Sequence, residues 1–507
     1  MMSPLTEILV EGLRVEAQRP WPRTIVAPKI WEIASKQLAE GHLILLGLWG
    51  DADAVHMALL NENPFDIGVV TVQCVDGRYP SVGAIHAPAI RLERTIRDLY
   101  GLEPVGLPDQ RPWLDHGRWG VKHPLGASVK ALPASASYAF LPAEGESLHQ
   151  IAVGPVHAGI IEPGHFRFTA TGETVVRLEQ RFGYAHKGIE SLMIGTDLNR
   201  ATRLSGRTSG DSTVAYALAF AHAVEAALDI KVPVRATWLR ALMAEIERLA
   251  NHFGDFGAIC NDAAFSMMLA QCGILRELTL RAAAASFGHR LMMDRVVPGG
   301  VSADLDPHGE PQLRNLLTEI ERLFPTLVEL YDNTASLQDR TVTTGLLKPA
   351  LARQFGAGGY VGRASGRAFD ARRAVAYAPY DDLKFEVPVL EEGDVNARVW
   401  IRIREIEQSV ALIKQILDRL PSGPTRIEVS ARGASAMREG LGLVEAFRGD
   451  VLAWVRLDNA GHIDRCHLRD PSWFQWPLLE AAIEGNIVAD FPLCNNSFNC
   501  SYSGHDL

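Results

Sequence analysis

The chain has 507 residues, of which 47% are hydrophobic and 22% are charged, and its formal net charge is −10. This length predicts roughly two to four domains, and the composition is typical of a soluble globular protein. The negative charge argues against a general nucleic-acid-binding surface, and no run approaches the roughly 20 apolar residues of a membrane span. We therefore expect any membrane association to go through partner subunits.

The six cysteines are scattered and form no CxxC pair. They are Cys74, Cys260, Cys272, Cys466, Cys494 and Cys500. The sequence thus encodes neither an iron–sulfur site nor a structural zinc locally, and a reducing cytosolic compartment is expected. The first residues place acids within an apolar stretch and show no small-residue cleavage signature, so no secretory signal is expected.

Residues 1–125 are predicted to form a compact α/β domain. The patterns indicate a helix at 29–40, strands at 42–49 and 67–74, and a charged amphipathic helix at 89–102. The expected buried face of the first helix consists of Ile30, Ile33, Ala34 and Leu38, and Gly41 is expected to end it.

Residues 126–150 are rich in Pro, Gly and Trp and are expected to form an extended linker. Residues 151–507 are expected to form a large, mainly helical domain with small peripheral β-sheets, which makes the fold class α+β. The domain begins with a strand and a hairpin that turns at Gly172, and helices follow to about residue 295.

Two long helices are predicted at 238–253 and 399–420. The apolar stripe of the first consists of Leu239, Leu242, Met243, Ile246, Leu249 and Phe253, with Arg240, Glu245, Glu247 and Arg248 off it. The second is followed by strands at 425–432 and 451–458 and a short helix at 477–485.

Two neighbouring stretches gather groups that can transfer protons. "GPVHAGIIEPGHFRF" contains His157, Glu162 and His165, and "RFGYAHKGIESLM" adds Lys187 and Glu190. Imidazole and carboxylate groups relay protons near neutral pH, and glycines let the backbone approach a ligand. In isolation, a turn with surface histidines and a solvated helix start are the favoured explanations of these residues.

The stretch "RLSGRTSGD" has the spacing of a two-ligand metal turn, Ser205-x-x-Thr208, but hydroxyls are poor ligands for soft transition metals. A Ser/Thr-rich helix start is the alternative. In "VGRASGRAFDARR", arginines and Asp370 stand among small residues, and a buried ion-pair network is favoured over a phosphate site. Cys494 and Cys500 match no metal motif and are expected to be unligated. There is no nucleophile elbow, P-loop or dinucleotide fingerprint.

Several of these stretches, in this order, resemble a known family. "RLERTIRDLYGLEPVGLPDQR" is similar to the small hydrophilic subunit of complex I. "GPVHAGIIEPGHFRF", "GYAHKGIESLM", "AEIERLANH", "GRASGRAFDARR" and "EEGDVNARVWIRIREIEQS" are similar to its quinone-site subunit. They look even more like the large subunit of membrane-bound, energy-converting nickel–iron hydrogenases of the formate hydrogenlyase type, in which the two modules are fused in this same order. The resemblance implies a hydrogenase-large-subunit-like second domain.

The resemblance also implies where metal ligands would be. Relatives hold nickel and iron with Arg-x-Cys-Gly-x-Cys near the start of the large domain and Asp-Pro-Cys-x-x-Cys near its end. The first motif aligns with Arg203, Ser205 and Thr208, and the second places Ser501 and Gly504 on the other cysteines. Since these four ligand positions lack thiols, we expect no nickel–iron site and no metal or cofactor held by this chain itself.

The quinone-site subunit is the other template that the resemblance offers. His157 matches a histidine that contacts the quinone head group there, whereas Gly206 replaces the partnering tyrosine. Glu190 fits the family's Arg-Gly-x-Glu motif with Lys187 in place of arginine, and His157, Glu162, Glu190 and Arg203 are the cavity and proton-transfer candidates. A quinone or another small redox substrate in the vacated cavity is thus an expectation.

The leading hypothesis is a peripheral subunit of a complex I-like, hydrogenase-related membrane oxidoreductase complex. Its expected partners are an iron–sulfur small subunit with its clusters, a membrane anchor and antiporter-like subunits, with no nucleic acid. The expected location is the cytoplasmic side of the inner membrane. The alternatives are a non-catalytic coupling or assembly scaffold in such a complex, and a free-standing soluble hydrolase or dehydrogenase, for which no motif is present.

Overall fold

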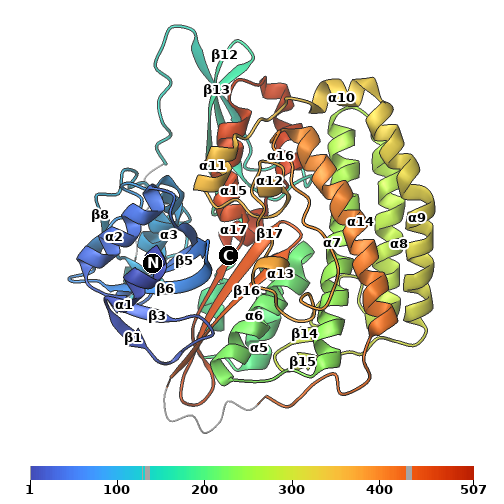
Figure 1. The fold of residues 1–507 in the computed structure, drawn as a ribbon. Coiled ribbons are helices and arrows are strands. Elements are labelled where there is room, and N and C mark those ends of the chain that lie inside the picture. The colour runs from blue at the N-terminus through green and yellow to red at the C-terminus, as the bar shows by residue number, and fades with distance from the viewer. Residues whose placement is uncertain (1, 128–129, 132–137, 430–436) are drawn as a thin grey trace.

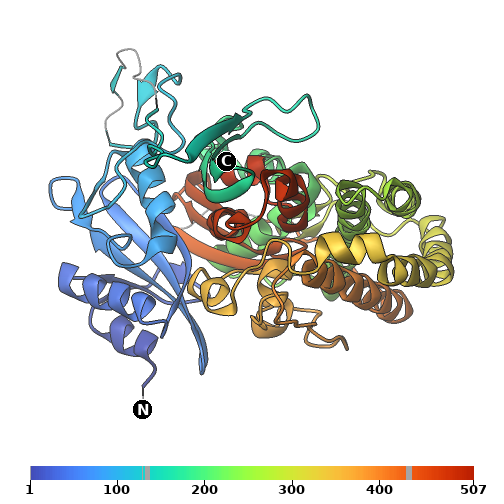
Figure 2. The same cartoon turned by 90° about the horizontal axis from the view of Figure 1, so that it is seen from above.

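The computed structural model describes residues 2–127, 130–131, 138–429 and 437–507. A small α/β domain lies beside a larger, mainly helical one, and the carboxyl terminus lies between them (Figures 1 and 2). The expected α+β class, with a helical large domain and small sheets, is confirmed. No helix in the described part of the chain is long and apolar enough to cross a membrane.

The small domain is built on a five-stranded sheet with the order β1-β3-β6-β5-β4. Its strands are β1 (Leu13–Val15), β3 (Arg23–Val26), β4 (Ile44–Gly50), β5 (Ala54–Glu62) and β6 (Phe65–Gln73). Its helices are α1 (Pro4–Val10), α2 (Pro28–Ala39) and α3 (Ile90–Tyr100), and β7 (Arg78–Pro80) pairs with β8 (Glu103–Val105). The helices and strands expected at 29–40, 42–49, 67–74 and 89–102 are confirmed.

The buried face of α2 differs from the expected one. Trp31, Ala34 and Leu38 are buried, whereas Ile33 is 41% exposed. The Trp31 indole is fully buried, its Nε1 donates to the carbonyl of Pro80 at 2.9 Å, and its ring contacts that of Tyr79 edge to face. A large aromatic ring with a satisfied N–H buries more apolar surface than an isoleucine.

The two domains share a sheet and an ion pair. Strand β2 (Gln18–Arg19) pairs in parallel with β16 (Arg438–Ala446) in a sheet of order β18-β17-β16-β2, completed by β17 (Gly449–Leu457) and β18 (Ile463–Arg469). Asp51 of the small domain forms an ion pair with Arg456 of β17. The Trp49 ring stacks on that of His467 with centroids 5.1 Å apart. These contacts fix the small domain against the large one.

A three-stranded sheet opens the large domain. It consists of β11 (Leu148–Val153), β12 (His165–Thr171) and β13 (Thr174–Arg181), and the expected hairpin turns at Gly172, whose φ is +56°. Strand β11 begins inside the range expected as a linker. Of that range, residues 128–129 and 132–137 lie outside the described residues.

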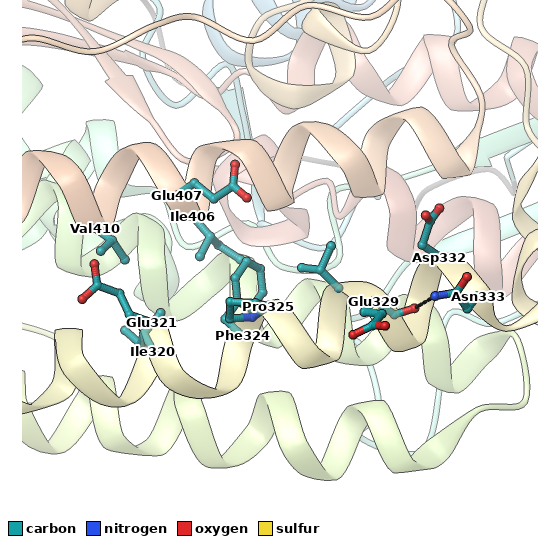
Figure 3. A pocket seen from close by; sticks show the side chains of 11 residues that line it. Ile320, Glu321, Phe324, Pro325, Glu329, Asp332, Asn333, Ile406, Glu407 and Val410 are labelled. Carbon is teal, nitrogen blue, oxygen red and sulfur yellow. Dashed lines mark hydrogen bonds between the residues drawn. The ribbon is translucent and has the colours of Figure 1, made fainter.

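Long helices of the large domain stand side by side (Figures 1 and 2). They are α7 (Val234–Asp262), α8 (Ser266–Phe287), α9 (Gly309–Asn333) and α14 (Val395–Arg419). Helix α6 (Thr213–Leu228) instead packs mainly on β16 and β17. Shorter helices are α4 (Ile189–Met193), α5 (Leu198–Ser205), α10 (Ala335–Thr341), α11 (Pro349–Gln354), α12 (Gly359–Arg363), α13 (Ala371–Ala374), α15 (Ser472–Ile483), α16 (Phe491–Phe498) and α17 (Tyr502–Asp506). A groove of about 550 Å³ runs between α9 and α14 (Figure 3).

Helix α7 is more buried than its sequence pattern indicates. The six expected apolar residues are buried, and so are Arg240, Glu245, Glu247 and Arg248, which lie off that stripe. The helix expected at 399–420 is confirmed as α14. Of the strand expected at 425–432, residues 425–429 contribute only a bridge between Arg426 and Gly300, and residues 430–432 lie outside the described residues.

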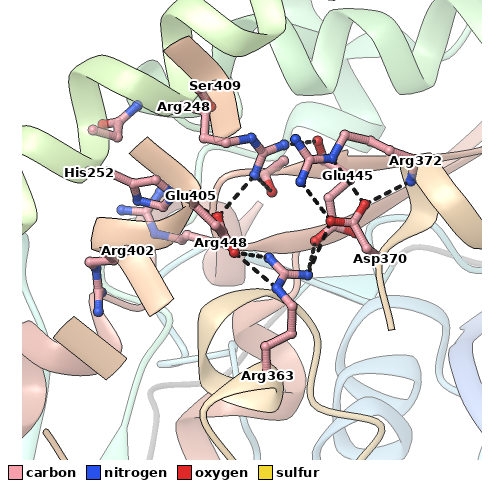
Figure 4. A network of polar contacts seen from close by, with 12 residues as sticks. Arg248, His252, Arg363, Asp370, Arg372, Arg402, Glu405, Ser409, Glu445 and Arg448 are labelled. Carbon is pink, nitrogen blue, oxygen red and sulfur yellow. Dashed lines mark hydrogen bonds and ion pairs between the residues drawn. The ribbon is translucent and has the colours of Figure 1, made fainter. Parts of the chain in front are cut away.

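A buried network of charged side chains joins α7, α12, α13, α14 and β16 (Figure 4). Arg363 donates to Glu405 at 2.9 Å and to Glu445 at 2.8 Å, and neither it nor its partners are accessible to more than 2%. Arg372 donates to Asp370 at 2.7 Å and to Glu245 at 2.9 Å. The ion-pair network expected around residues 363–373 is thereby confirmed.

The network keeps the Glu405 carboxylate ionised in spite of its burial. Burial alone would raise the pKa of Glu405, but the Arg363 guanidinium and a 2.7 Å hydrogen bond from His252 hold that pKa well below its usual range. Burying charges is costly unless every charge has a partner of good geometry. The network therefore fixes one relative arrangement of the helices and the sheet.

Replacing Arg363 by methionine is expected to lower the free energy of unfolding by about 3–5 kcal/mol, because Glu405 and Glu445 would lose the guanidinium that compensates their burial. The matched control is Arg404→Met, which removes only the exposed pair with Glu407 and should cost less than about 1 kcal/mol. Urea unfolding of both variants measures the difference, and equal losses would contradict this account of the network.

Candidate functional site

Four chain segments converge beside the carboxyl terminus. They are the loop 154–164 between β11 and β12, the turn 183–188 before α4, the loop 203–212 between α5 and α6, and the tail 499–507. Residues 500–507 are all buried, and the tail is bound mainly through backbone and hydroxyl groups. Its place between the domains determines the shape of the site.

The end of the tail is bound by the turn 183–188. The Asp506 carboxylate accepts the amides of Gly183 at 2.9 Å and Ala185 at 2.8 Å. The carbonyl of Leu507 accepts the amides of Lys187 at 2.8 Å and Gly188 at 3.1 Å. Anion binding by a run of backbone amides needs no charged partner, so a short tail can be held firmly.

The ring of His505 fixes the tail from the other side. It stacks on Trp473 with centroids 4.0 Å apart, accepts the Trp113 indole N–H at 3.2 Å and bonds Asp506 at 2.9 Å. Burial lowers the pKa of His505, which favours the neutral ring that can accept this hydrogen bond.

The loop 203–212 meets the tail through hydroxyl groups. The Oγ atoms of Ser209 and Ser501 lie 2.9 Å apart, and Ser209 donates to Asp211 at 2.8 Å. Because Ser209 uses its proton on Asp211, the Ser501 hydroxyl donates to Ser209 and accepts the Gly504 amide at 2.9 Å. Ser501 is thereby the amino-terminal cap of α17.

Of the two hydroxyl groups that align with metal ligands in this loop, the one of Ser205 has a hydrogen-bond partner and the one of Thr208 has none among the described residues. Ser205 is fully buried and its hydroxyl donates to the carbonyl of Thr202 at 2.8 Å. Thr208 is also fully buried, but its Oγ1 has no hydrogen-bond partner within the described residues. An unpartnered buried hydroxyl is costly, so Thr208 offers a donor to anything that enters beside it.

Gly504 leaves no room for a side chain. A Cβ atom there would lie 2.3 Å from Oδ2 of Asp470 and 2.8 Å from Oγ of Ser501. Asp470 is buried and accepts the Tyr216 hydroxyl at 2.7 Å, so its carboxylate cannot easily withdraw. The sequence patterns did not indicate Asp470, because it is distant in the chain from the stretches 203–208 and 501–504.

Lys187 bridges the loop and the tail with a positive charge. Its Nζ donates to the carbonyl of Thr208 at 3.0 Å and lies 3.4 Å from that of Ser503. The amide of Ser503 donates to Glu162 at 3.0 Å. Partial burial lowers the pKa of Lys187, while the carboxylates of Glu162, Asp506 and Asp470 oppose that shift. Lys187 and Glu162 are both exposed and form the mouth of the site.

Among the described residues, the side chains of the remaining candidates have no hydrogen bond to Lys187, Thr208 or the tail. His157 bonds the carbonyl of Gly164 in its own loop at 2.7 Å. Arg203 is exposed on α5. Glu190 is buried, accepts from His467 at 2.8 Å and lines, together with Leu507, an interdomain cavity of about 20 Å³, room for about one water molecule.

Cys494 and Cys500 are buried free thiols. The Cys500 sulfur lies 3.9 Å from the Gln475 amide oxygen, and burial raises the pKa of both thiols, that of Cys494 to about 12. Within the described ranges, no group of three or more His, Cys, Asp or Glu residues is arranged to hold a metal ion.

Asp211 links the site to a small side cavity that the sequence patterns did not indicate. Arg448 donates to both carboxylate oxygens of Asp211, at 2.8 and 2.6 Å, and to the carbonyl of Asn499. A cavity of about 90 Å³ is lined by Asp211, Glu247 and neighbouring side chains. Burial raises the pKa of Glu247 to about 8, and the charge of Asp211 adds to the shift.

Comparisons with known proteins place this arrangement in a family. Residues 50–133 match the family described as the 30 Kd subunit of respiratory-chain NADH dehydrogenase, and residues 262–439 match its 49 Kd subunit. Residues 187–259 match the nickel-dependent hydrogenase family.

Curated relatives cover most of the chain. Formate hydrogenlyase subunit 5 of Escherichia coli (strain K12) is 33% identical over 449 residues, which are 86% of this chain and 78% of the relative. An NADH-quinone oxidoreductase subunit of Roseiflexus sp. (strain RS-1) is 32% identical over 352 residues, 67% of this chain and 94% of the relative.

A solved structure is also similar. It is a chain of the membrane-bound sulfane sulfur reductase, an archaeal respiratory membrane complex, with a TM-score of 0.67 and 26% identity. The similarity covers 71% of this chain and 99% of that chain.

Glu247→Gln is expected to flatten the pH dependence of stability. The folded pKa of about 8 exceeds the ordinary 4.5, so between these values the folded state binds more protons than the unfolded state and stability falls as pH rises. The measurement is the slope of the unfolding free energy against pH, with the exposed Glu319→Gln as control. An unchanged slope in Glu247→Gln would show that Glu247 is ionised in the folded protein.

Gly504→Ala is expected to destabilise the protein by about 1–3 kcal/mol, because the added methyl group overlaps the Asp470 carboxylate. Gly210→Ala is the matched control in the facing loop, since a Cβ there meets no atom within 4 Å. Thermal unfolding compares the two variants. Equal stability would mean that Asp470 can leave the space beside Gly504.

Proposed function

We propose that this chain, which belongs to the family of fused complex I-type subunits that includes formate hydrogenlyase subunit 5, is the peripheral subunit of a complex I-like oxidoreductase complex. In this proposal, the position that corresponds to the nickel–iron site holds no metal. The chain is thus assigned to an oxidoreductase complex by its family. What we propose beyond the family is that the chain holds no nickel–iron centre, which substrate it binds and which subunits it contacts.

The residues at the positions that align with metal ligands support the proposal that the chain holds no nickel–iron centre. Nickel and iron centres of this type need soft thiolate ligands. Ser205 and Ser501 instead use their hydroxyls within the protein, and the space beside Gly504 is taken by the Asp470 carboxylate. The residues present therefore do not fit a nickel–iron centre, and no step of the proposed chemistry passes through one.

The proposed ligand of the groups around Lys187 is a quinone or another small redox substrate. The unpartnered Thr208 hydroxyl and the Lys187 ammonium group are two hydrogen-bond donors for a carbonyl oxygen. A quinone supplies two such oxygens and takes up protons when it is reduced. Lys187 and Glu162 are groups that can hold a proton beside it. Electrons would come from iron–sulfur clusters in a partner subunit.

A non-catalytic scaffold is the second candidate. It is favoured by His157, whose ring nitrogen bonds its own loop, and by the many site groups that only join the loop to the tail. In both cases the proposed partners are an iron–sulfur subunit, a membrane anchor and antiporter-like subunits. The proposed place is the cytoplasmic side of the cell membrane, reached through those partners.

Variants in the intact complex separate the two candidates. If the site is a redox site, Lys187→Met and Thr208→Val are expected to lower the turnover of a water-soluble quinone by about tenfold or more, because each removes a donor worth about 1.4 kcal/mol, with assembly intact. His149→Ala, on the exposed face of β11, is the matched control. Unchanged turnover in both site variants, together with failed assembly when the chain is deleted, would instead identify a scaffold.

A further inference from the structure

The groove between α9 and α14 lies away from the carboxyl terminus (Figure 1), and apolar and acidic side chains line it (Figure 3). On α9, Ile320, Phe324 and Val328 follow one another at intervals of four residues and therefore line one face. On α14, Ile406 and Val410 have the same spacing. The volume of the groove, about 550 Å³, is in the range of ligand sites. Pro325 and Val328 are its accessible apolar residues, whereas Ile320, Phe324, Ile406 and Val410 are buried beneath them.

A proline inside α9 adds a polar feature to the floor. Pro325 lacks the amide that would bond the carbonyl of Glu321 one turn earlier, and both residues line the groove. The carbonyl of Glu321 is thus without its usual helical donor. A docked segment with a free N–H, or a lysine, can use this acceptor.

The rim of the groove is acidic. The eleven lining residues include Glu321, Glu329, Asp332 and Glu407 and no lysine or arginine. Glu321 pairs with Lys414 and Glu407 with Arg404, both near the surface. Glu329 and Asp332 form no ion pair with any described residue, so one end of the groove keeps a negative charge available to a ligand.

The apolar residues and the carboxylates of the groove together indicate which kind of ligand it can bind. An apolar floor between two helices accepts the apolar face of a third helix, and an acidic rim favours lysine and arginine along its edges. Nucleic acids and anionic lipid surfaces would be repelled by the same carboxylates. From Ile320 to Asn333 the groove extends about 20 Å, which matches three to four turns of helix.

We propose that the α9–α14 groove docks a cationic amphipathic helix of a partner protein. The apolar residues of that helix lie on Pro325 and Val328, and its basic residues face Glu329 and Asp332. This surface is independent of the substrate site and of the proposed function, because it lies on the opposite side of the helical layer from the tail.

The test uses two fluorescent synthetic peptides and the purified full-length chain. The first is a helical peptide of about 14 residues with leucines on one face and lysines at its flanks, and the second replaces every lysine by glutamate. Fluorescence anisotropy is expected to show binding of the lysine peptide, weakening with added salt, and no binding of the glutamate peptide. Binding of both peptides alike, or of neither, would overturn the proposal.

Two charge-reversed variants then locate the peptide. Glu329→Lys/Asp332→Lys is expected to weaken binding about tenfold, because two charge pairs are turned into repulsions. Glu7→Lys/Glu11→Lys changes the net charge equally but lies on and after α1 in the other domain, and it should bind as the unaltered chain does. Equal weakening in both variants would show that only the overall charge attracts the peptide.

A photo-crosslinker at the centre of the lysine peptide gives a readout that does not depend on variants. Crosslinks mapped by mass spectrometry to residues 320–333 or 406–410 support the proposal, and crosslinks confined to other segments overturn it. Circular dichroism of each variant shows whether its fold is retained.

Discussion

The binding of the carboxyl-terminal tail by backbone amides is the interaction on which the site depends. Asp506 and Leu507 accept four amide hydrogens from the turn 183–188, and His505 is wedged between Trp473 and Trp113. Because the tail is held at its end, Ser501 and Gly504 are brought against the loop 203–212. The hydroxyl contact between Ser209 and Ser501 and the Lys187 bridge are consequences of that position.

Arg448 connects this local arrangement to the buried ion network. It holds Asp211 and the carbonyl of Asn499 and comes from the turn beside β16, the strand that supplies Glu445 to the network. Buried charges with complete partners fix geometry more than they add stability. The loop, the tail and the helices around Arg363 therefore form one rigid frame, while Lys187 and Glu162 remain exposed at its edge.

Sequence patterns predicted the helices and the network but not the contacts of the site. The helices at 29–40, 238–253 and 399–420 follow from apolar periodicity, although Trp31 displaced Ile33 from the core. The network was predictable because arginines and an acid stand among small residues near Arg363. Asp470 and Ser209 were not, since they meet the tail through positions distant in the chain that no local spacing relates. The roles of His157, Glu190 and Arg203 remain predictions.

The most direct test of the central claim is the nickel content of the intact, purified complex, measured by mass spectrometry of the elements relative to the amount of this chain. The hydroxyl residues and the glycine at positions 205, 208, 501 and 504, with the Asp470 carboxylate in the space beside Gly504, predict no stoichiometric nickel, even when the metal is supplied during growth. One nickel per chain, lost when Ser205 or Ser501 is replaced by alanine, would contradict the account.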